Sequence, residues 1–189
     1  MTIGSKLVAS WGYDQTQYSI YTVMREKGRF VWVKGENSWS SLDDSDLAEG
    51  STVKLYKVTQ WEDLSEDERK DYSSRGFDEW AYRKHLTDDA IEAAPELTIV
   101  KMSRVNGDRY SHLWELSDGS THNSEEDWHT KKNVKIVQGL KKCLVQTSTY
   151  NGQEYVKIDE VITAYHDPEF ERNNRKYEEQ NEYTAYNGR

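Results

Sequence analysis

The chain has 189 residues, of which 35% are hydrophobic and 31% are charged, and its formal net charge at pH 7 is -9. This length accommodates one domain, or one domain with an appendage. No run of about 18 apolar residues and no secretory signal is apparent, and the single cysteine, Cys143, excludes an internal disulfide. We therefore expect a folded cytoplasmic protein without a membrane span, and one whose small core depends on aromatic residues.

The acidic residues are concentrated in one block of the chain. Residues 36–96 carry seven Lys/Arg against seventeen Asp/Glu, whereas residues 1–35 carry five against two. A strongly negative segment disfavours contact with nucleic-acid phosphates, because that interaction needs clustered Lys/Arg. The same segment favours attraction to a basic surface.

Residues 1–58 are predicted to form an N-terminal β-module. Short segments rich in β-branched and aromatic residues, bounded by turns, favour strands over helices. Four such segments follow one another here: KLVAS, YSIYTVMR, RFVWVK and VKLYKV. Strands of this length and number are typical of a small SH3-like barrel or a bent sheet.

Residues 59–96 are predicted to be a short acidic helical insertion. Ser65 followed by Glu68 fits a capping box that opens a first helix. The segment GFDEWAYRKHL places aromatic residues near helical spacing and predicts a second helix. A third short helix is expected after Thr87, ending before Pro95.

Residues 97–166 are predicted to complete the fold with antiparallel hairpins. Asn106-Gly107 and Asn151-Gly152 each separate two strand-like segments, and Asn-Gly suits the positive φ values of a type I′ turn. In RYSHLWEL, alternation places Tyr110, His112, Trp114 and Leu116 on one face. The fold class expected for the whole chain is α+β with mostly antiparallel β-structure.

Residues 167–189 have few aliphatic side chains and many charges and amides. Such a composition buries too little apolar surface to order by itself. We therefore expect a flexible polar tail, with spaced tyrosines that order only against a partner.

The sequence offers little that indicates catalysis. It lacks the glycine-rich nucleotide-binding motifs and the G-x-S-x-G motif, and Cys143 lies in a strand-like segment typical of a buried hydrophobe. The best metal candidate, HNSEEDWH, separates His122 and His129 by seven positions rather than four, so a polar loop is the simpler interpretation. The paired carboxylates lie in highly polar segments, where a solvated surface is expected rather than the shifted pKa of an acid catalyst. We expect neither catalytic residues nor a cofactor nor a metal.

The segment SWGYDQT, residues 10–16, resembles the opening of a family of small β-rich proteins from bacteriophages and other mobile elements. The resemblance covers about residues 6–34, and Gln17 replaces the Asn usual in that family. It implies a phage or prophage origin and a β-rich fold, but no reaction. Gly12 suits a sharp corner, and Asp14 and Thr16 are residues whose side chains hold such corners through backbone amides.

These observations lead to a functional expectation. The chain is predicted to be a phage-type accessory protein that binds and modulates a host protein with a basic surface, in host take-over or anti-defence, by presenting an acidic surface that resembles nucleic acid. The residues expected to contact this partner belong to the corner and to the insertion: Trp11, Tyr13, Asp14, Gln15, Asp63, Glu66, Asp67, Glu68, Asp78 and Glu79.

An alternative expectation concerns the N-terminal module. Lys and Arg residues accompany Trp11, Tyr13, Tyr18, Tyr21 and Trp32 there, and stacking aromatics near cations hold single strands in small β-barrels. This interpretation makes the module a binder of single-stranded nucleic acid or a nucleotide. The small positive charge of residues 1–35 makes it the weaker of the two.

Overall fold

The computed structural model describes residues 1–12, 16–42, 44–57, 60–107, 111–124 and 134–187. The chain divides into two compact units. Unit 1 combines residues 1–51 with residues 140–189, and unit 2 is the continuous segment 52–139. The boundaries predicted from sequence were 58, 96 and 166, whereas the chain passes between the units after Ser51 and after Gly139.

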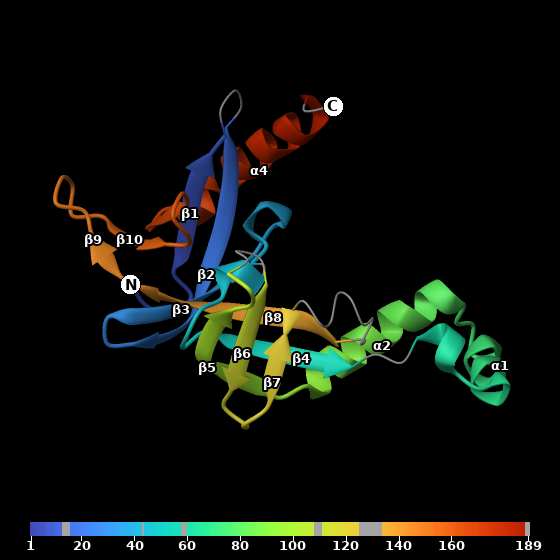
Figure 1. Ribbon diagram of the computed structural model, residues 1–189. Helices are drawn as coiled ribbons and strands as arrows, with labels where there is room; N and C mark the ends of the chain where they lie inside the picture. Colours follow the sequence, from blue (N-terminus) through green and yellow to red (C-terminus); the bar gives the residue numbers. More distant parts are fainter. Residues whose placement is uncertain (13–15, 43, 58–59, 108–110, 125–133, 188–189) are drawn as a thin grey trace. The chain divides into compact units, whose positions relative to one another are not determined.

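Unit 1 contains an open antiparallel sheet with one long helix (Figure 1). Its strands are ordered β8–β3–β2–β1–β11–β10–β9. Its elements, in chain order, are β1 (Lys6–Trp11), β2 (Gln17–Lys27), β3 (Phe30–Gly35), η1 (Ser38–Ser40), η2 (Asp44–Asp46), the end of β8 (Val134–Leu144), β9 (Gln146–Thr147), β10 (Glu154–Lys157), β11 (Thr163–His166) and α4 (Phe170–Asn187).

The core of unit 1 is formed by the central strands. β-Branched and aromatic side chains pack well on a pleated surface, which explains why these segments form strands. The buried residues come from β1, β2, β3, β8, β10 and β11 and from the segment after β10: Leu7, Ala9, Tyr21, Val23, Val31, Val33, Cys143, Val156, Ile158 and Ala164. The register of β2 with β3 shifts between Val23 and Arg25, and such a bulge bends a strand.

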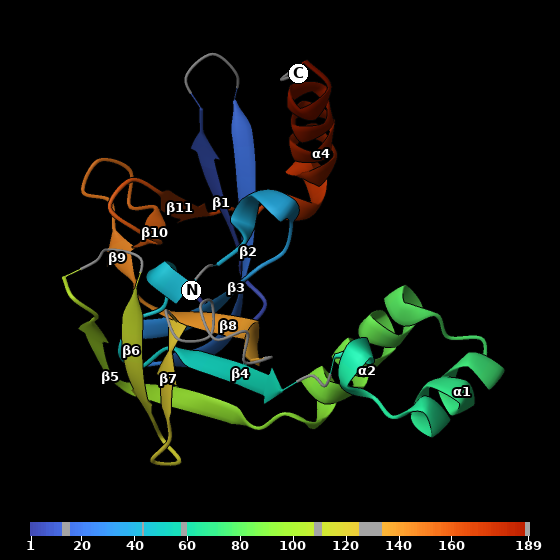
Figure 2. The same cartoon turned by 45° about the vertical axis from the view of Figure 1, so that its right-hand side comes forward.

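The segment 167–189, for which we expected a flexible tail, contains α4. This helix lies beside the β1–β2 hairpin in both views (Figures 1 and 2). Tyr177 packs against Tyr18 with ring centroids 4.7 Å apart, and its hydroxyl donates a 2.8 Å hydrogen bond to Asp167. Burial is the first cause that raises the pKa of Tyr177 to about 12, followed by the bond to Asp167. Tyr177, one of the tyrosines expected to order only against a partner, thus packs within the chain itself.

Unit 2 has an antiparallel sheet in the order β7–β6–β5–β4. The strands are β4 (Thr52–Lys57), β5 (Glu96–Arg104), β6 (His112–Leu116) and β7 (Thr121–Asn123). The expected alternation in β6 is confirmed, because His112, Trp114 and Leu116 are buried while Leu113 and Glu115 are not. Tyr110 lies outside the described residues.

The helical part of unit 2 comprises η3 (Trp61–Asp63), α1 (Glu66–Ser74) and α2 (Glu79–Ala93), and α1 lies away from the strands of its own unit (Figure 2). The predicted capping box is confirmed, since Ser65 and Glu68 bond each other's backbone N–H groups. The helix expected after Thr87 does not begin there, because α2 continues unbroken through that position. Asp78, rather than Thr87, caps it by accepting from the Ala81 N–H at 2.8 Å.

Both Asn-Gly dipeptides connect paired antiparallel strands as predicted, but neither connection is the two-residue type I′ turn, since in the first the Val105 N–H donates to the Ser111 carbonyl oxygen. Asn106 and Gly107 have φ values of 51° and 74°, as expected for this dipeptide, between the paired strands β5 and β6. Between β9 and β10, only Gly152 of the second dipeptide has a positive φ, 69°. The Gly152 N–H donates to the Ser148 carbonyl oxygen, and the Ser148 N–H donates to the Gln153 carbonyl oxygen. This loop is therefore longer than a two-residue turn.

The coarse prediction of fold class is confirmed: the structure is mostly antiparallel β-sheet with helices. Its sheet is open, and the SH3-like barrel stays a prediction. Among the described residues, no helix has both the length and the apolar character that crossing a bilayer requires.

Candidate functional site

The acidic residues predicted to bind a partner in the helical insertion are all exposed. Asp63 is the last residue of η3, whereas the others lie in the first turns of α1 and α2 or just before them: Glu66, Asp67, Glu68, Asp78 and Glu79. Carboxylates at these places also stabilise the helices, because the N-terminus of a helix carries partial positive charge. Carboxylates at helix starts therefore stabilise their own helices whether or not they also bind a partner.

Two of these carboxylates have structural roles as caps. The Glu68 carboxylate accepts from the Ser65 hydroxyl at 2.7 Å and from the Ser65 N–H at 2.9 Å, and these bonds lower the pKa of Glu68. Asp78 caps α2. A cap that is engaged with its own helix offers less to a partner than an unengaged carboxylate.

The other four differ in their ionic partners. Glu79 pairs with Arg83 at 2.9 Å, and Glu66 lies 3.9 Å from Lys70 with both side chains strongly exposed. Asp63 and Asp67 form no ion pair with any residue that the structure describes. Exposed pairs of this kind contribute little to stability, so these carboxylates are available to other cations.

An aromatic cluster fixes the helices that display these carboxylates. Tyr82 is buried, and its ring lies 4.5 Å from that of Tyr72 and 5.3 Å from that of Trp61. The Arg75 guanidinium lies 4.4 Å from the centroid of the Tyr72 ring. Lys54 of β4 donates to the Ile91 carbonyl oxygen at 3.2 Å and so ties α2 to the sheet of unit 2.

Trp80 is the exposed aromatic residue that sequence reasoning missed. It directly follows Glu79 and keeps 72% of its surface accessible. The sequence spacing placed Trp80 on one apolar stripe with Phe77, Tyr82 and Leu86. Of these residues Tyr82 is buried, as that stripe predicts, whereas Trp80 is not.

In the SWGYDQT corner, the structure describes the two flanks. Strands β1 and β2 pair up to Trp11 and Gln17, and Gly12 has a φ of 120°, where glycine is favoured. The Trp11 indole N–H donates to the Ser19 hydroxyl at 2.7 Å, and its ring meets the edge of Trp39 with centroids 5.9 Å apart. Trp11 retains 36% exposure, whereas Tyr13, Asp14 and Gln15 lie outside the described residues.

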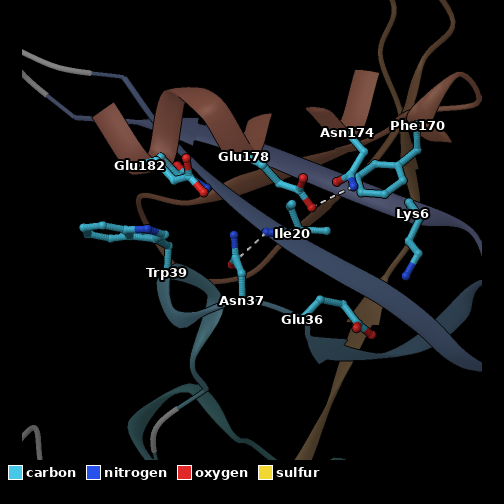
Figure 3. Close-up of a pocket in the computed structure, with 10 residues that line it drawn as sticks. Lys6, Ile20, Glu36, Asn37, Trp39, Phe170, Asn174, Glu178 and Glu182 are labelled. Carbon is cyan, nitrogen blue, oxygen red and sulfur yellow. Dashed lines mark hydrogen bonds between the residues drawn. The ribbon is translucent and has the colours of Figure 1, made fainter. Parts of the chain in front are cut away.

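A cavity of about 610 Å³ lies in unit 1, between α4 and the segment joining β3 to η1. Figure 3 shows that its lining side chains come from α4 on one side and from residues 36–39 on the other, with β2 between them. It is lined by Lys6, Ile20, Glu36, Asn37, Trp39, Phe170, Asn174, Glu178, Asn181 and Glu182.

Two asparagines hold the walls of this cavity together. The Asn181 carboxamide accepts from the Tyr18 N–H at 2.8 Å and donates to the Tyr18 carbonyl oxygen at 2.9 Å. The Asn37 amide donates to the same carbonyl oxygen at 2.9 Å. These bonds attach both α4 and the segment before η1 to the backbone of one residue of β2.

The other chemical candidates give no site. Cys143 is buried, and burial raises the pKa of its thiol to about 12, so it stays protonated at neutral pH. His122 is buried with its ring centroid 5.2 Å from that of Trp114, while His129 and the acidic residues between them lie outside the described residues. Within the described part of the chain, no group of three His, Cys, Asp or Glu side chains has the arrangement of a metal site.

Comparison with protein-family models, with curated proteins and with solved structures finds no match to this chain.

Proposed function

We propose that this chain is a non-enzymatic protein that docks its acidic helical segment, residues 59–96, on a basic surface of another protein and thereby modulates that protein. The observation that carries the proposal is the exposure of Asp63 and Asp67 without an ionic partner in the described structure. They are presented by helices with a packed aromatic cluster beneath them. A rigid display lowers the entropy cost of binding.

The resemblance of SWGYDQT to phage proteins supplies the setting for this proposal. A phage-type accessory protein acts in the host cytoplasm on a host protein, in take-over or against a defence system such as a nuclease. Carboxylates spread over short helices resemble the phosphates of nucleic acid. The segment is thus suited to occupy the basic groove of a nucleic-acid-binding protein.

Trp80 adds an apolar anchor to this surface. Interfaces gain most of their binding energy from a few large side chains, among which tryptophan is enriched. An indole that is 72% exposed beside Glu79 combines such an anchor with the negative charge around it. The corner around Trp11, Tyr13, Asp14 and Gln15 is proposed as a second contact.

The alternative, binding of single-stranded nucleic acid or a nucleotide by the N-terminal aromatics, has less support. Tyr21 and Trp32 are buried, and the Trp32 indole N–H donates to the Gly50 carbonyl oxygen at 2.7 Å. Arg25 and Lys142 already lie near the Trp32 ring, at 5.5 Å and 5.8 Å from its centroid. Rings engaged in this way offer little surface for a base to stack on.

The proposal is tested by neutralising the available carboxylates without removing the caps. The variant Asp63→Asn/Glu66→Gln/Asp67→Asn leaves Glu68 and Asp78 in place. We expect wild-type protein to retain a stoichiometric host protein in affinity purification followed by native mass spectrometry, and the triple variant to lose it. Binding of the isolated partner should also weaken as salt concentration rises.

A matched control changes the same charge elsewhere. Glu160→Gln/Glu171→Gln/Glu179→Gln alters three exposed carboxylates of unit 1 and should retain the partner. The proposal is wrong if the partner is held equally by both triple variants, or if no stoichiometric protein is recovered. Salt-sensitive quenching of tryptophan fluorescence by an oligonucleotide would instead favour the alternative.

A further inference from the structure

We propose that the cavity of unit 1 between α4 and residues 36–39 binds an organic cation, namely a guanidinium or primary ammonium group on an apolar stem. The site belongs to unit 1, and the inference does not depend on the acidic helices of unit 2. Its volume, about 610 Å³, lies within the range of roughly 300–1,000 Å³ usual for small-molecule sites.

The first argument is charge. Three carboxylates, those of Glu36, Glu178 and Glu182, line the cavity against a single ammonium, that of Lys6. None of the three forms an ion pair with a residue that the structure describes. Lys6 is engaged with the protein itself, because its ammonium lies 2.6 Å from the Thr22 hydroxyl and 5.7 Å from the centroid of the Phe170 ring. The cavity therefore has net negative charge that favours a cationic ligand.

The second argument is that an aromatic ring, that of Trp39, and a carboxylate, that of Glu182, lie at the same end of the cavity. In Figure 3, Trp39 and Glu182 lie toward one end of the row of lining residues, and Phe170 and Lys6 lie toward the other. Trp39 is held by the edge contact with Trp11, and the Ser19 hydroxyl donates to its carbonyl oxygen at 2.6 Å. Tryptophan is the aromatic side chain that attracts cations most strongly, and carboxylates accept strong hydrogen bonds from guanidinium groups.

The third argument is the apolar surface between these ends. Ile20 and Phe170 contribute aliphatic and aromatic surface to the lining, which suits the methylene stem of an alkylammonium or alkylguanidinium ion. Asn174 donates to the Glu178 carboxylate at 2.9 Å and fixes its position. The three glutamates are exposed, so their charge repels an anionic ligand and gives a neutral one no ionic attraction, whereas a cation gains charge-assisted hydrogen bonds from them.

The walls are preorganised for such a ligand. Asn181 is nine-tenths buried, and its two bonds to the Tyr18 backbone hold α4 in place, while Asn37 holds the opposite wall to the same residue. A site whose walls are already ordered loses less entropy on binding. The cation can arrive as a free small molecule or as the side chain of a peptide, and the test separates these sources.

The test uses 1-butylguanidine and its neutral counterpart 1-butylurea as probes of the full chain, with isothermal titration calorimetry and ¹⁵N NMR. We expect binding of the guanidine and not of the urea, with a shift of the Trp39 indole resonance, assigned by its absence in Trp39→Phe. Glu178→Gln/Glu182→Gln should weaken binding about tenfold or more. Glu171→Gln/Glu179→Gln, which changes the same charge on α4 outside the cavity, should leave it within about twofold.

A second arm compares an acetylated Gly-Arg-Gly amide with the same peptide containing citrulline. Tighter binding of the arginine peptide than of butylguanidine indicates a peptide source, and the reverse indicates a free small molecule. The proposal would be overturned if butylguanidine and butylurea bound equally, or if neither butylguanidine nor the arginine peptide bound. It would also be overturned if Glu178→Gln/Glu182→Gln and Glu171→Gln/Glu179→Gln had equal affinities for butylguanidine. Circular dichroism confirms that each variant is folded before its affinity is compared.

Discussion

At the scale of single residues, the Asn181 side chain takes the place of a neighbouring strand. Strand β3 pairs with β2 only from Tyr21 onward, so Tyr18 has no β3 residue opposite it. The carboxamide of Asn181 offers an acceptor and a donor and bonds both the N–H and the carbonyl oxygen of Tyr18. A strand edge covered in this way is also protected from pairing with another chain.

We expect Asn181→Ala to lower the free energy of unfolding of unit 1 by about 1–3 kcal/mol, because it removes two part-buried hydrogen bonds to the Tyr18 backbone. Chemical denaturation followed by circular dichroism measures this change. Asn174→Ala, on the same face of α4 two turns earlier and with its side chain bonded to the exposed Glu178, should cost much less. Equal losses for the two variants would show that the bonds to Tyr18 contribute little.

At the scale of elements, the short acidic helices owe their boundaries to side chains that bond their own backbone. Helix α1 begins at a reciprocal pair between Ser65 and Glu68, and α2 begins at Asp78. Such caps satisfy N–H groups that the first turn of a helix leaves without partners. They are encoded within four residues, which is why the start of α1 could be predicted.

Ser65→Ala should raise the pKa of Glu68 toward its ordinary value, because the Ser65 side-chain bond is the first cause of its lowering. A carboxyl with a lowered pKa in the folded state adds stability above its unfolded pKa, and this stability is lost as pH falls through the folded pKa. In Ser65→Ala, the stability of α1 should therefore fall less as the pH is lowered through the range in which Glu68 titrates. NMR titration of the Glu68 side chain measures the shift.

Asp118 is the internal control for this titration. Its pKa is lowered in the same way by Ser120, on a turn outside the insertion, and should not change in Ser65→Ala. A Glu68 pKa that stays low in the variant would mean that backbone groups, namely the N–H of residue 65 and the helix N-terminus, determine it rather than the Ser65 hydroxyl.

At the scale of the whole molecule, both units contain buried hydrophobic residues among those that the structure describes. The buried residues of unit 1 form a cluster with strands from both ends of the sequence, and those of unit 2 include Val53, Ile99, Trp114 and Leu116. A continuous segment with its own buried residues is expected to respond to a core substitution as a cooperative unit.

Trp114→Ala should therefore cost about 3–5 kcal/mol in unit 2, because it removes a fully buried ring. Native-state hydrogen exchange should show lost protection at Ile99 and Leu116, while Val33 of unit 1 keeps its protection. Val100→Ala, at a position of β5 that is 60% exposed, is the control in the same unit and should change little. An equal loss of hydrogen-exchange protection in both units would contradict the expectation that the two units respond independently to a core substitution.

The sequence by itself determined the features whose causes lie within a few residues. The capping box at Ser65, the alternation from His112 to Leu116, and the positive φ of Asn106-Gly107 follow from hydrogen bonds and sterics between near neighbours. The exposure of the acidic binding candidates in 59–96 followed in the same way from their polar surroundings.

Only the tertiary structure decided where distant segments meet. Asn181 and Tyr18 are 163 positions apart, and no local signal in the amide-rich C-terminal segment shows that it forms a helix against β2. The cavity lining spans Lys6 to Glu182 for the same reason, so its residues were not recognised from sequence as a group. Local energetics can define a helix cap, whereas a cavity depends on long-range packing that brings unrelated segments together.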